Sequence, residues 1–570
     1  MRSLALLAIL LIHGGAAQAQ RPANPNLTTV SELRDTVARF SEDRAALLRR
    51  YTVDYSPARR DRMRAFYGEW QQRLTALNFD RLGMEGQVDY ILLANRLRRE
   101  LDLLQQEERR YAGMAQWVPF APAVFQLEES RRRMDTVDAR AAARALTTIA
   151  VQVDSLRGLT QGADKSRSGK IVALRAAALS DALRRTLQAW DRYYAAYDPA
   201  FTWWTSDPYR RADQSLERYV RSLRETIVGI REGEEEPIVG DPIGAEALRA
   251  ELGYELIAYT PDEILAIAER EFAWCETELK KASRDMGLGD DWKAALERVK
   301  NSYLPPGDQP RLIRDLAHEA VQFVTSRHLV TVPPLADEIW RMEMMTPERQ
   351  RVNPFFTGGE VISVSYPTDA MTTDEKLMSM RGNNPAFSRA TVFHELIPGH
   401  HLQGYMTDRY NPHRDAFGTP FWTEGWSLYW EMLLWDLGFA RTPEERIGML
   451  FWRTHRAARI IFSLKVQMGT MTPDEAIDFL VDRVGHERAN AIAEVRRSFN
   501  GTYSPLYQAA YMLGGLQFRA LHHELVDSRR MTDQQFHDAI LQGGRMPVEM
   551  VRARLTGQRL TRDYVAQWRF

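Results

Sequence analysis

The sequence of 570 residues is 44% hydrophobic and 26% charged, which is ordinary for a globular protein with two or more packed subdomains. Its formal net charge of −1 gives no support for a nucleic-acid or acidic-membrane partner. Because Cys275 is the only cysteine, an intramolecular disulfide is excluded.

The N-terminus has the pattern of an export signal. Arg2 precedes an apolar run over residues 4–12, and Ala17-Gln18-Ala19 fits a cleavage site. We predict cleavage after Ala19 and export, with a bacterial periplasm as the expected destination; a frayed N-terminal helix is the alternative. No cysteine follows the cleavage site, so no lipid anchor is expected there. No later segment has 18 uninterrupted apolar residues, so no membrane-spanning helix is expected in the mature chain.

Helical periodicity dominates residues 28–230, with Arg and Glu on the polar faces at i,i+4 spacing. The stretch 231–244, REGEEEPIVGDPIG, combines acids, prolines and glycines, which predicts a junction. After a signal peptide over residues 1–19, we therefore expect one helical subdomain over residues 20–240. A second one, over residues 241–570, carries the candidate site described below.

Two features are predicted beyond the junction. A helix should begin at Pro261 with Thr260 as its N-cap, and its amphipathic pattern places Cys275 in the core. Further on, β-branched residues bounded by Gly and Pro predict a short strand over residues 360–366. The segment 328–334 could pair with that strand as a hairpin. Everything after residue 385 has a helical pattern.

The pair His-Glu occurs four times, and three of the occurrences fail as metal sites. A zinc hydrolase needs three protein ligands, an open position for water and a carboxylate that acts as general base. The pairs at 318–319 and 486–487 are followed by Gln and Asn where a ligand is needed. The pair at 523–524 is followed by Asp527, but no third ligand is apparent. For these three, surface or core histidines are predicted.

The fourth pair lies in TVFHELIPGHHLQ, residues 391–403. His394 and Glu395 are followed by two further histidines, His400 and His401. Glu424 lies 24 residues after His400, about the separation at which the third ligand follows the second histidine in the gluzincin class of zinc peptidases. This spacing indicates a metal-hydrolase site.

Helix geometry leaves the second ligand open. At about 100° per residue, His400 would lie about 120° away from His394 on a regular helix, whereas His401 would be nearly on the same face. Pro398, however, cannot donate a hydrogen bond and clashes with the carbonyl of His394, and Gly399 adds freedom. A bulge or kink over residues 396–399 is expected, and it could bring His400 beside His394.

The residues HELIPGHHLQ, TEGWSLYWE and SPLYQAAYMLGG resemble the motifs of the DUF885 family. The resemblance extends from about residue 30 to the C-terminus. Members are bacterial proteins regarded as zinc peptidases, similar in fold to gluzincin carboxypeptidases and angiotensin-converting enzyme. The resemblance implies a mainly α, two-lobed architecture around a deep cleft, with a small β-sheet or hairpin near the active site. The third motif departs from the family, with SPLYQ at 504–508 where the family tends to have Pro-Gly-Gln.

Carried over residue by residue, the family pattern assigns roles to five positions. His394 and His400 match the two histidine ligands and Glu424 the third ligand. Glu395 matches the general base, and Tyr511 matches a late tyrosine. The family residue after the second histidine is variable, which favours His400 over His401 as the ligand.

Further residues are candidates for supporting roles. Tyr511, and after it Tyr507, could donate a hydrogen bond to the tetrahedral oxyanion, or either could be an ordinary core aromatic residue. Glu431, His401 and Gln403 are candidates to hold the ligating histidines by hydrogen bonds.

The predicted function is hydrolysis of peptide bonds with one Zn²⁺, with a metal-activated water and Glu395 as general base. The expected partner is therefore a peptide substrate. The alternatives are a non-catalytic helical binding protein of the same fold and a zinc amidohydrolase that acts on a non-peptide amide.

Overall fold

The computed structural model describes residues 30–195, 197–231, 236–350, 353 and 355–570. The predicted signal peptide lies outside these residues. In the described part the chain is mainly helical with one small sheet, so the predicted mainly α class with a small sheet is confirmed. None of the described helices is long and apolar enough to cross a bilayer.

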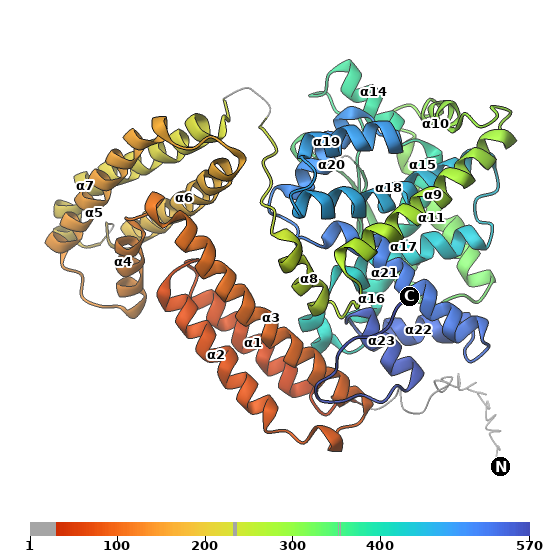
Figure 1. Cartoon of the computed structure of the whole chain (residues 1–570), viewed down its shortest axis with the longest axis horizontal. Coiled ribbons are helices and arrows are strands. Elements are labelled where there is room, and N and C mark those ends of the chain that lie inside the picture. Colours follow the sequence, from red (N-terminus) through yellow and green to blue (C-terminus); the bar gives the residue numbers. More distant parts are fainter. Residues whose placement is uncertain (1–29, 196, 232–235, 351–352, 354) are drawn as a thin grey trace, which may run out of the picture.

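The first part of the chain forms long helices, which occupy the left of Figure 1. Their bounds are α1 (Arg34–Arg50), α2 (Pro57–Thr75), α3 (Met84–Met114), α4 (Ala121–Arg133), α5 (Ala139–Leu159), α6 (Arg167–Ala195) and α7 (Pro199–Ser222). Helix α7 packs against α5 and α6, and α2 packs against α3.

The second part continues with helices and contains both strands. Its elements are α8 (Gly244–Tyr254), α9 (Pro261–Asp285), α10 (Trp292–Lys300), α11 (Gln309–Ser326), α12 (Pro334–Ile339), β1 (Arg341–Met344), α13 (Pro347–Gln350), β2 (Val361–Val364), α14 (Thr373–Gly382), α15 (Pro385–Glu395) and α16 (His400–Thr407). The chain ends with α17 (Pro420–Asp436), α18 (Pro443–Gln467), α19 (Pro473–Phe479), α20 (Arg488–Phe499), α21 (Tyr507–His522), α22 (Asp533–Gly543) and α23 (Val548–Thr556).

Several of these helices begin at a Thr-Pro or Asn-Pro pair. The side chains of Thr260, Asn384, Thr442 and Thr472 each accept a hydrogen bond from the backbone N–H three residues later. The proline that follows loses nothing, because a first-turn N–H has no partner within the helix. The predicted start of α9 at Pro261 is therefore confirmed.

The buried hydrophobic residues form two large clusters and a small one. One large cluster holds residues of α4–α7, from Met114 to Val239. The other joins α1–α3 to the helices that follow residue 244, as Figure 1 shows for α3 beside α8. The predicted boundary near residue 240 stays a prediction. Cys275 is buried on α9, as predicted, and burial raises the pKa of its thiol to about 12.

The small sheet differs from the predicted hairpin. Strand β2 falls within the predicted residues 360–366, but it pairs in parallel with β1, with Arg341 opposite Val361. Segment 328–334 forms no strand, because its apolar residues Leu329 and Val330 are buried in the large cluster that includes α1–α3. Burial in the core has thus replaced the cross-strand pairing that the sequence suggested.

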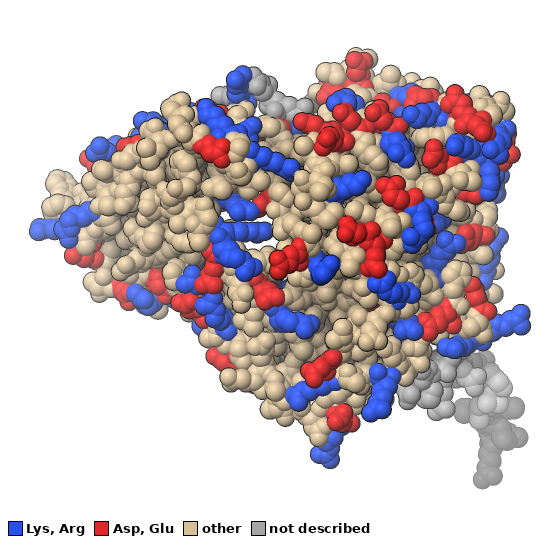
Figure 2. Space-filling model, viewed as in Figure 1, with Lys and Arg blue, Asp and Glu red and all other residues tan. Residues whose placement is uncertain are grey.

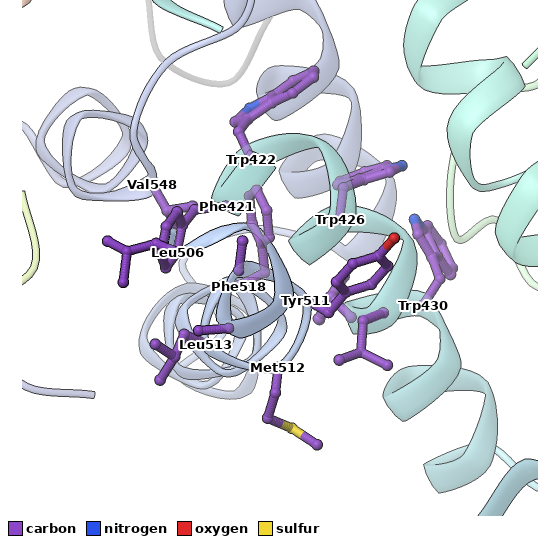
Figure 3. Packing of buried hydrophobic residues seen from close by; sticks show 14 of the residues in the cluster. Phe421, Trp422, Trp426, Trp430, Leu506, Tyr511, Met512, Leu513, Phe518 and Val548 are labelled. Atoms are coloured by element: carbon purple, nitrogen blue, oxygen red, sulfur yellow. The ribbon is translucent and has the colours of Figure 1, made fainter. Parts of the chain in front are cut away.

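Helices α17 and α21 approach each other closely, and this approach positions the site. A Cβ atom added at Gly514 would lie 2.1 Å from the carbonyl oxygen of Phe421, so the contact requires glycine. Trp422, Trp426 and Trp430 of α17 are fully buried, and Figure 3 shows them spaced along this helix. The surface seen in Figure 2 has basic and acidic side chains interspersed, with a hollow between the left and right parts.

A buried ion network joins the N-terminal helices to the C-terminal ones. Arg414 lies 2.7 Å from a carboxylate oxygen of Asp89 and 2.7 Å from one of Glu85, and it donates to the carbonyl of Gly543. Arg554 lies 2.9 Å from Glu85 as well. Burial would raise the pKa of Asp89, but Arg414 holds it below its usual range. The buried carboxylates of the N-terminal part are therefore neutralised by arginines of the C-terminal part.

Removal of one partner of this network should destabilise the whole protein. We expect Arg414→Met to lower the free energy of unfolding by about 3–5 kcal/mol, because Asp89 stays buried without its guanidinium partner and Glu85 keeps only Arg554. Urea denaturation of the purified protein measures the loss. The control is Arg488→Met, whose pair with Asp478 is exposed and should contribute less than about 1 kcal/mol. Similar losses in the two variants would contradict the prediction.

Candidate metal centre

The motif 391–403 spans two helices, and the break between them lies at residues 396–399, where the sequence predicts a bulge or kink. Helix α15 ends at Glu395 and α16 begins at His400, with a cis peptide bond between Ile397 and Pro398. The N–H of Gly399 donates to the carbonyl of Phe393. A Cβ atom at Gly399 would lie 1.8 Å from the carbonyl oxygen of His394, so glycine is required at this turn.

The turn brings His394 and His400 to the same carboxylate. His400 Nε2 lies 3.1 Å from Glu424 Oε2, and His394 Nε2 lies 3.6 Å from the same oxygen. One ligand atom from each of the three residues lies within 4.8 Å of the others. Ligands at about 2.0–2.1 Å from a tetrahedral zinc lie about 3.3 Å from one another. The three side chains therefore fit one zinc ion with little movement.

The remote nitrogens of both histidines have acceptors. His394 Nδ1 lies 2.6 Å from Glu431 Oε1, and His400 Nδ1 lies 3.2 Å from Ser427 Oγ. Ser427 donates its own hydrogen to the carbonyl of His394, so its oxygen accepts from His400. Because both Nδ1 atoms have acceptors, a metal ion that took the place of the Nε2 protons would meet a lone pair on each ring.

The two other predicted supporting residues lie elsewhere. His401 Nε2 donates to the carbonyl of Ala336, so this ring is turned away from the three ligands. Gln403 is buried and donates to the carbonyl of Trp422, which fixes the start of α17 beside α16. The structure thus brings His400, and not His401, to His394 and Glu424, and it brings Glu431 to His394.

Glu395 faces the same cavity as the candidate ligands. The cavity has a volume of about 390 Å³ and is lined by residues of α15, α16, α17, α18, α20 and α21 and of segment 355–358. Glu395 is 9% exposed, and its backbone carbonyl accepts from the N–H of Gly359. Burial raises the pKa of its carboxyl, which suits a group that has to exchange a proton.

Charges within the cluster are strongly coupled. Burial alone would lower the pKa of His394, but the carboxylates of Glu424 and Glu431 raise it to about 9. Burial would raise the pKa of Glu424, but His400 and His394 hold it well below its usual range. Glu424 is therefore ionised, as a metal ligand must be.

Both candidate tyrosines lie on α21 and line the cavity. The Tyr507 hydroxyl donates to Glu424. The ring of Tyr511 is stacked near that of His394, with centroids 6.2 Å apart, and among the described residues no group forms a hydrogen bond with its hydroxyl. Burial raises the pKa of both phenols, so both remain donors.

Sequence reasoning missed several polar residues of the cavity wall. They include Arg456, Arg459, Arg497 and Tyr503. The two arginines of α18 lie three residues apart and both line the cavity. Their presence alone was no signal, because the buried Arg453 of the same helix pairs with Glu271 and does not line the cavity.

The other His-Glu pairs lie outside this cavity. His318 is exposed, and His486 is buried, 2.9 Å from a nitrogen of His455. His523 is exposed, but the structure brings it to Asp527 and His522, whose ligand atoms lie within 4.8 Å of one another. This second group was missed, because His522 precedes the pair and was not considered as a ligand. His522 Nε2 already lies 2.9 Å from Asp533.

The fold is similar to that of two solved structures. One is called "a putative lipoprotein of unknown function from Shewanella oneidensis"; its TM-score is 0.68 at 17% identity, over 92% of this chain and 100% of that chain. The other is "the putative lipoprotein from Colwellia psychrerythraea", with a TM-score of 0.59 at 15% identity, over 92% of this chain and 97% of that chain. At these identities the likeness shows the fold alone.

No curated protein matches the chain. One family does, and its description is "Bacterial protein of unknown function (DUF885)". The match covers residues 43–555 and so includes the candidate ligands, Glu395 and both tyrosines. The resemblance of the three motifs is thereby confirmed at the level of the family: the chain belongs to the DUF885 family.

Proposed function

We propose that this protein is a zinc-dependent peptidase. The observation that carries the proposal is the convergence of His394, His400 and Glu424 in a cavity that also contains the carboxyl group of Glu395. Two neutral imidazoles and one carboxylate, with a separate carboxylate beside them, form the donor set of hydrolytic zinc sites. The two similar structures are called putative lipoproteins, which supports our further proposal that this chain is exported and acts in the periplasm.

The protein would hold the metal through atoms that are already oriented. Glu431 and Ser427 hold the two imidazole rings so that each Nε2 faces Glu424. A bound Zn²⁺ would supply Lewis-acid chemistry, which polarises a carbonyl and activates a water molecule.

Glu395 acts as the general base and then as the general acid. It removes a proton from the attacking water and later delivers a proton to the leaving nitrogen. Hydrolysis adds one water across the C–N bond and leaves a carboxylate and an amine. The burial that raises the pKa of Glu395 makes the carboxylate a stronger base towards the water and keeps the proton on it until the leaving nitrogen takes it.

The two tyrosines have different roles. Because the Tyr511 hydroxyl has no partner among the described residues and lies beside His394, it donates to the oxyanion that develops on the substrate carbonyl. Tyr507 is already engaged by Glu424, so it positions this ligand.

The first test separates chemistry from metal binding. Glu395→Gln should retain about one zinc per chain, because Glu395 is not a ligand, and it should lose about 10²–10⁴-fold in the rate of peptide hydrolysis. Elemental analysis and a peptide digest followed by mass spectrometry measure the two quantities. Full activity in this variant would overturn the mechanism.

The second test addresses the choice between adjacent histidines. His400→Ala should lose zinc, because one of the three ligands is removed. His401→Ala should retain it, because this ring donates to the Ala336 carbonyl. Zinc content after dialysis distinguishes the variants, and loss of zinc from His401→Ala alone would contradict the assignment.

The third test compares the two hydroxyl groups. Tyr511→Phe should lower kcat by about 10²–10³-fold with little change in KM or zinc content. Tyr507→Phe should weaken zinc binding instead, by about tenfold or more, because its partner is a ligand. Steady-state kinetics and competition with a chelator measure the effects. A kcat within twofold of wild type in Tyr511→Phe would exclude it as the oxyanion donor.

A further inference from the structure

Three arginines form one wall of the cavity. Arg456 and Arg459 come from α18 and Arg497 from α20, and their residues are 5%, 2% and 9% exposed. Arginine stays charged at every accessible pH, so burial cannot be relieved by loss of a proton. Each guanidinium therefore needs hydrogen-bond acceptors inside the protein or in a ligand.

Arg456 lacks such acceptors within the described structure. Its guanidinium makes no hydrogen bond there, and its Nε is buried without a partner. The nearest carboxylate oxygen is Glu431 Oε1, at 3.6 Å from Nη2. This oxygen already accepts from His394 at 2.6 Å. Arg456 instead lies over the rings of Tyr511 and Trp452, at 4.6 and 5.2 Å from their centroids.

The other two arginines share one carboxylate. Arg459 Nε donates to Glu494 at 2.7 Å, and Arg497 Nη1 lies 3.8 Å from the other oxygen of Glu494. Arg459 Nη1 is buried without a partner. Arg497 has one further acceptor, the Tyr503 hydroxyl at 2.9 Å. Three cations thus face one dedicated carboxylate.

The excess of positive charge also shifts the pKa of the neighbouring imidazole of His455. Burial first, and then Arg459, Arg456 and Arg497, lower the pKa of His455 well below its usual range. The wall can attract an anion, because three guanidinium groups with few acceptors line a cavity that a small ligand can enter.

The position of the wall relative to the metal centre limits the kind of anion. The Tyr511 ring lies 6.2 Å from the ring of His394, and the Arg456 and Arg459 guanidinium carbons lie 4.6 and 4.4 Å from the Tyr511 ring centroid. An extended residue spans about 3.3–3.6 Å. An anion on the arginines therefore lies no more than about three extended residues away from His394.

We propose that Arg456, assisted by Arg459, binds the carboxyl-terminal carboxylate of the substrate and so makes the protein a carboxypeptidase that releases short C-terminal fragments. The inference rests on the proposed peptidase function and adds the substrate class: peptides with a free α-carboxylate next to the scissile bond. A planar guanidinium matches a carboxylate with two parallel hydrogen bonds. The same donors could also accept the carboxylate of an Asp or Glu side chain, and the experiment separates these sources.

The test is equilibrium binding, which needs no hydrolysis. Three peptides are titrated into the zinc-free full-length protein: N-acetyl-Ala-Ala-Phe with a free carboxyl, its carboxamide, and N-acetyl-Ala-Glu-Phe carboxamide. The free acid should bind about 30-fold more tightly than either carboxamide, a ratio that corresponds to about 2 kcal/mol. Equal binding of the free acid and its carboxamide would overturn the proposal. Tight binding of the glutamate peptide would overturn the α-carboxylate assignment.

Two variants test whether Arg456 is the residue that causes the preference for the free acid. Arg456→Met should weaken binding of the free acid by about 30-fold and leave the carboxamides unchanged, whereas Arg456→Lys should retain part of the preference. The matched control is Arg453→Met on the same helix. Arg453 is also 5% exposed, but it pairs with Glu271 at 2.8 Å and does not line the cavity. Circular dichroism checks folding, and an unchanged preference in both Arg456 variants would contradict the assignment.

Hydrolysis by the zinc-loaded protein distinguishes the two proposals. If the free acid binds preferentially but no peptide is cleaved, the carboxylate site stands and the peptidase function fails. If the free acid and its carboxamide are cleaved at equal rates, the peptidase function stands and the carboxylate site fails.

Discussion

His394 and His400 can share one carboxylate only because the helix is interrupted between them. On a continuous helix their side chains would diverge by about 120°. The interruption at 396–399 ends α15 at Glu395 and restarts the chain as α16 at His400. Glu424 then meets both rings from α17, and the close approach of α17 to α21 brings Tyr507 to Glu424. The remaining features of the site are arranged around this one turn.

The charged and polar side chains of the site are buried inside a helical core. Such a group is stable only if its members form hydrogen bonds or ion pairs with one another. Glu431 accepts from His394, Ser427 accepts from His400, and Glu494 pairs with Arg459. These contacts come from different helices, so the side chains are held by the packing of the whole second part of the chain. Arg456 and the hydroxyl of Tyr511 differ from these, because neither forms a hydrogen bond among the described residues.

The sequence allowed the fold class, the start of α9 and the group of candidate ligands to be predicted, because each depends on local pattern and spacing. The choice between His400 and His401 could not be made from periodicity, since it depends on how the backbone turns at Gly399. The partner of strand 360–366 was predicted wrongly, because Leu329 and Val330 gain more from burial in the core than from pairing. The arginine wall was missed because its members come from α18 and α20, which are separated in sequence and meet only in the folded chain.

Glu431 connects the two halves of the cavity. One of its oxygens accepts from His394 at 2.6 Å and lies 3.6 Å from Arg456, while its other oxygen is buried without a partner. A carboxylate bound by Arg456 would satisfy this guanidinium, so Glu431 would no longer be the nearest carboxylate available to it. The hydrogen bond that orients His394 would then face less competition. The proposed binding of a carboxylate by Arg456 and the orientation of His394 would therefore be linked through a single buried side chain.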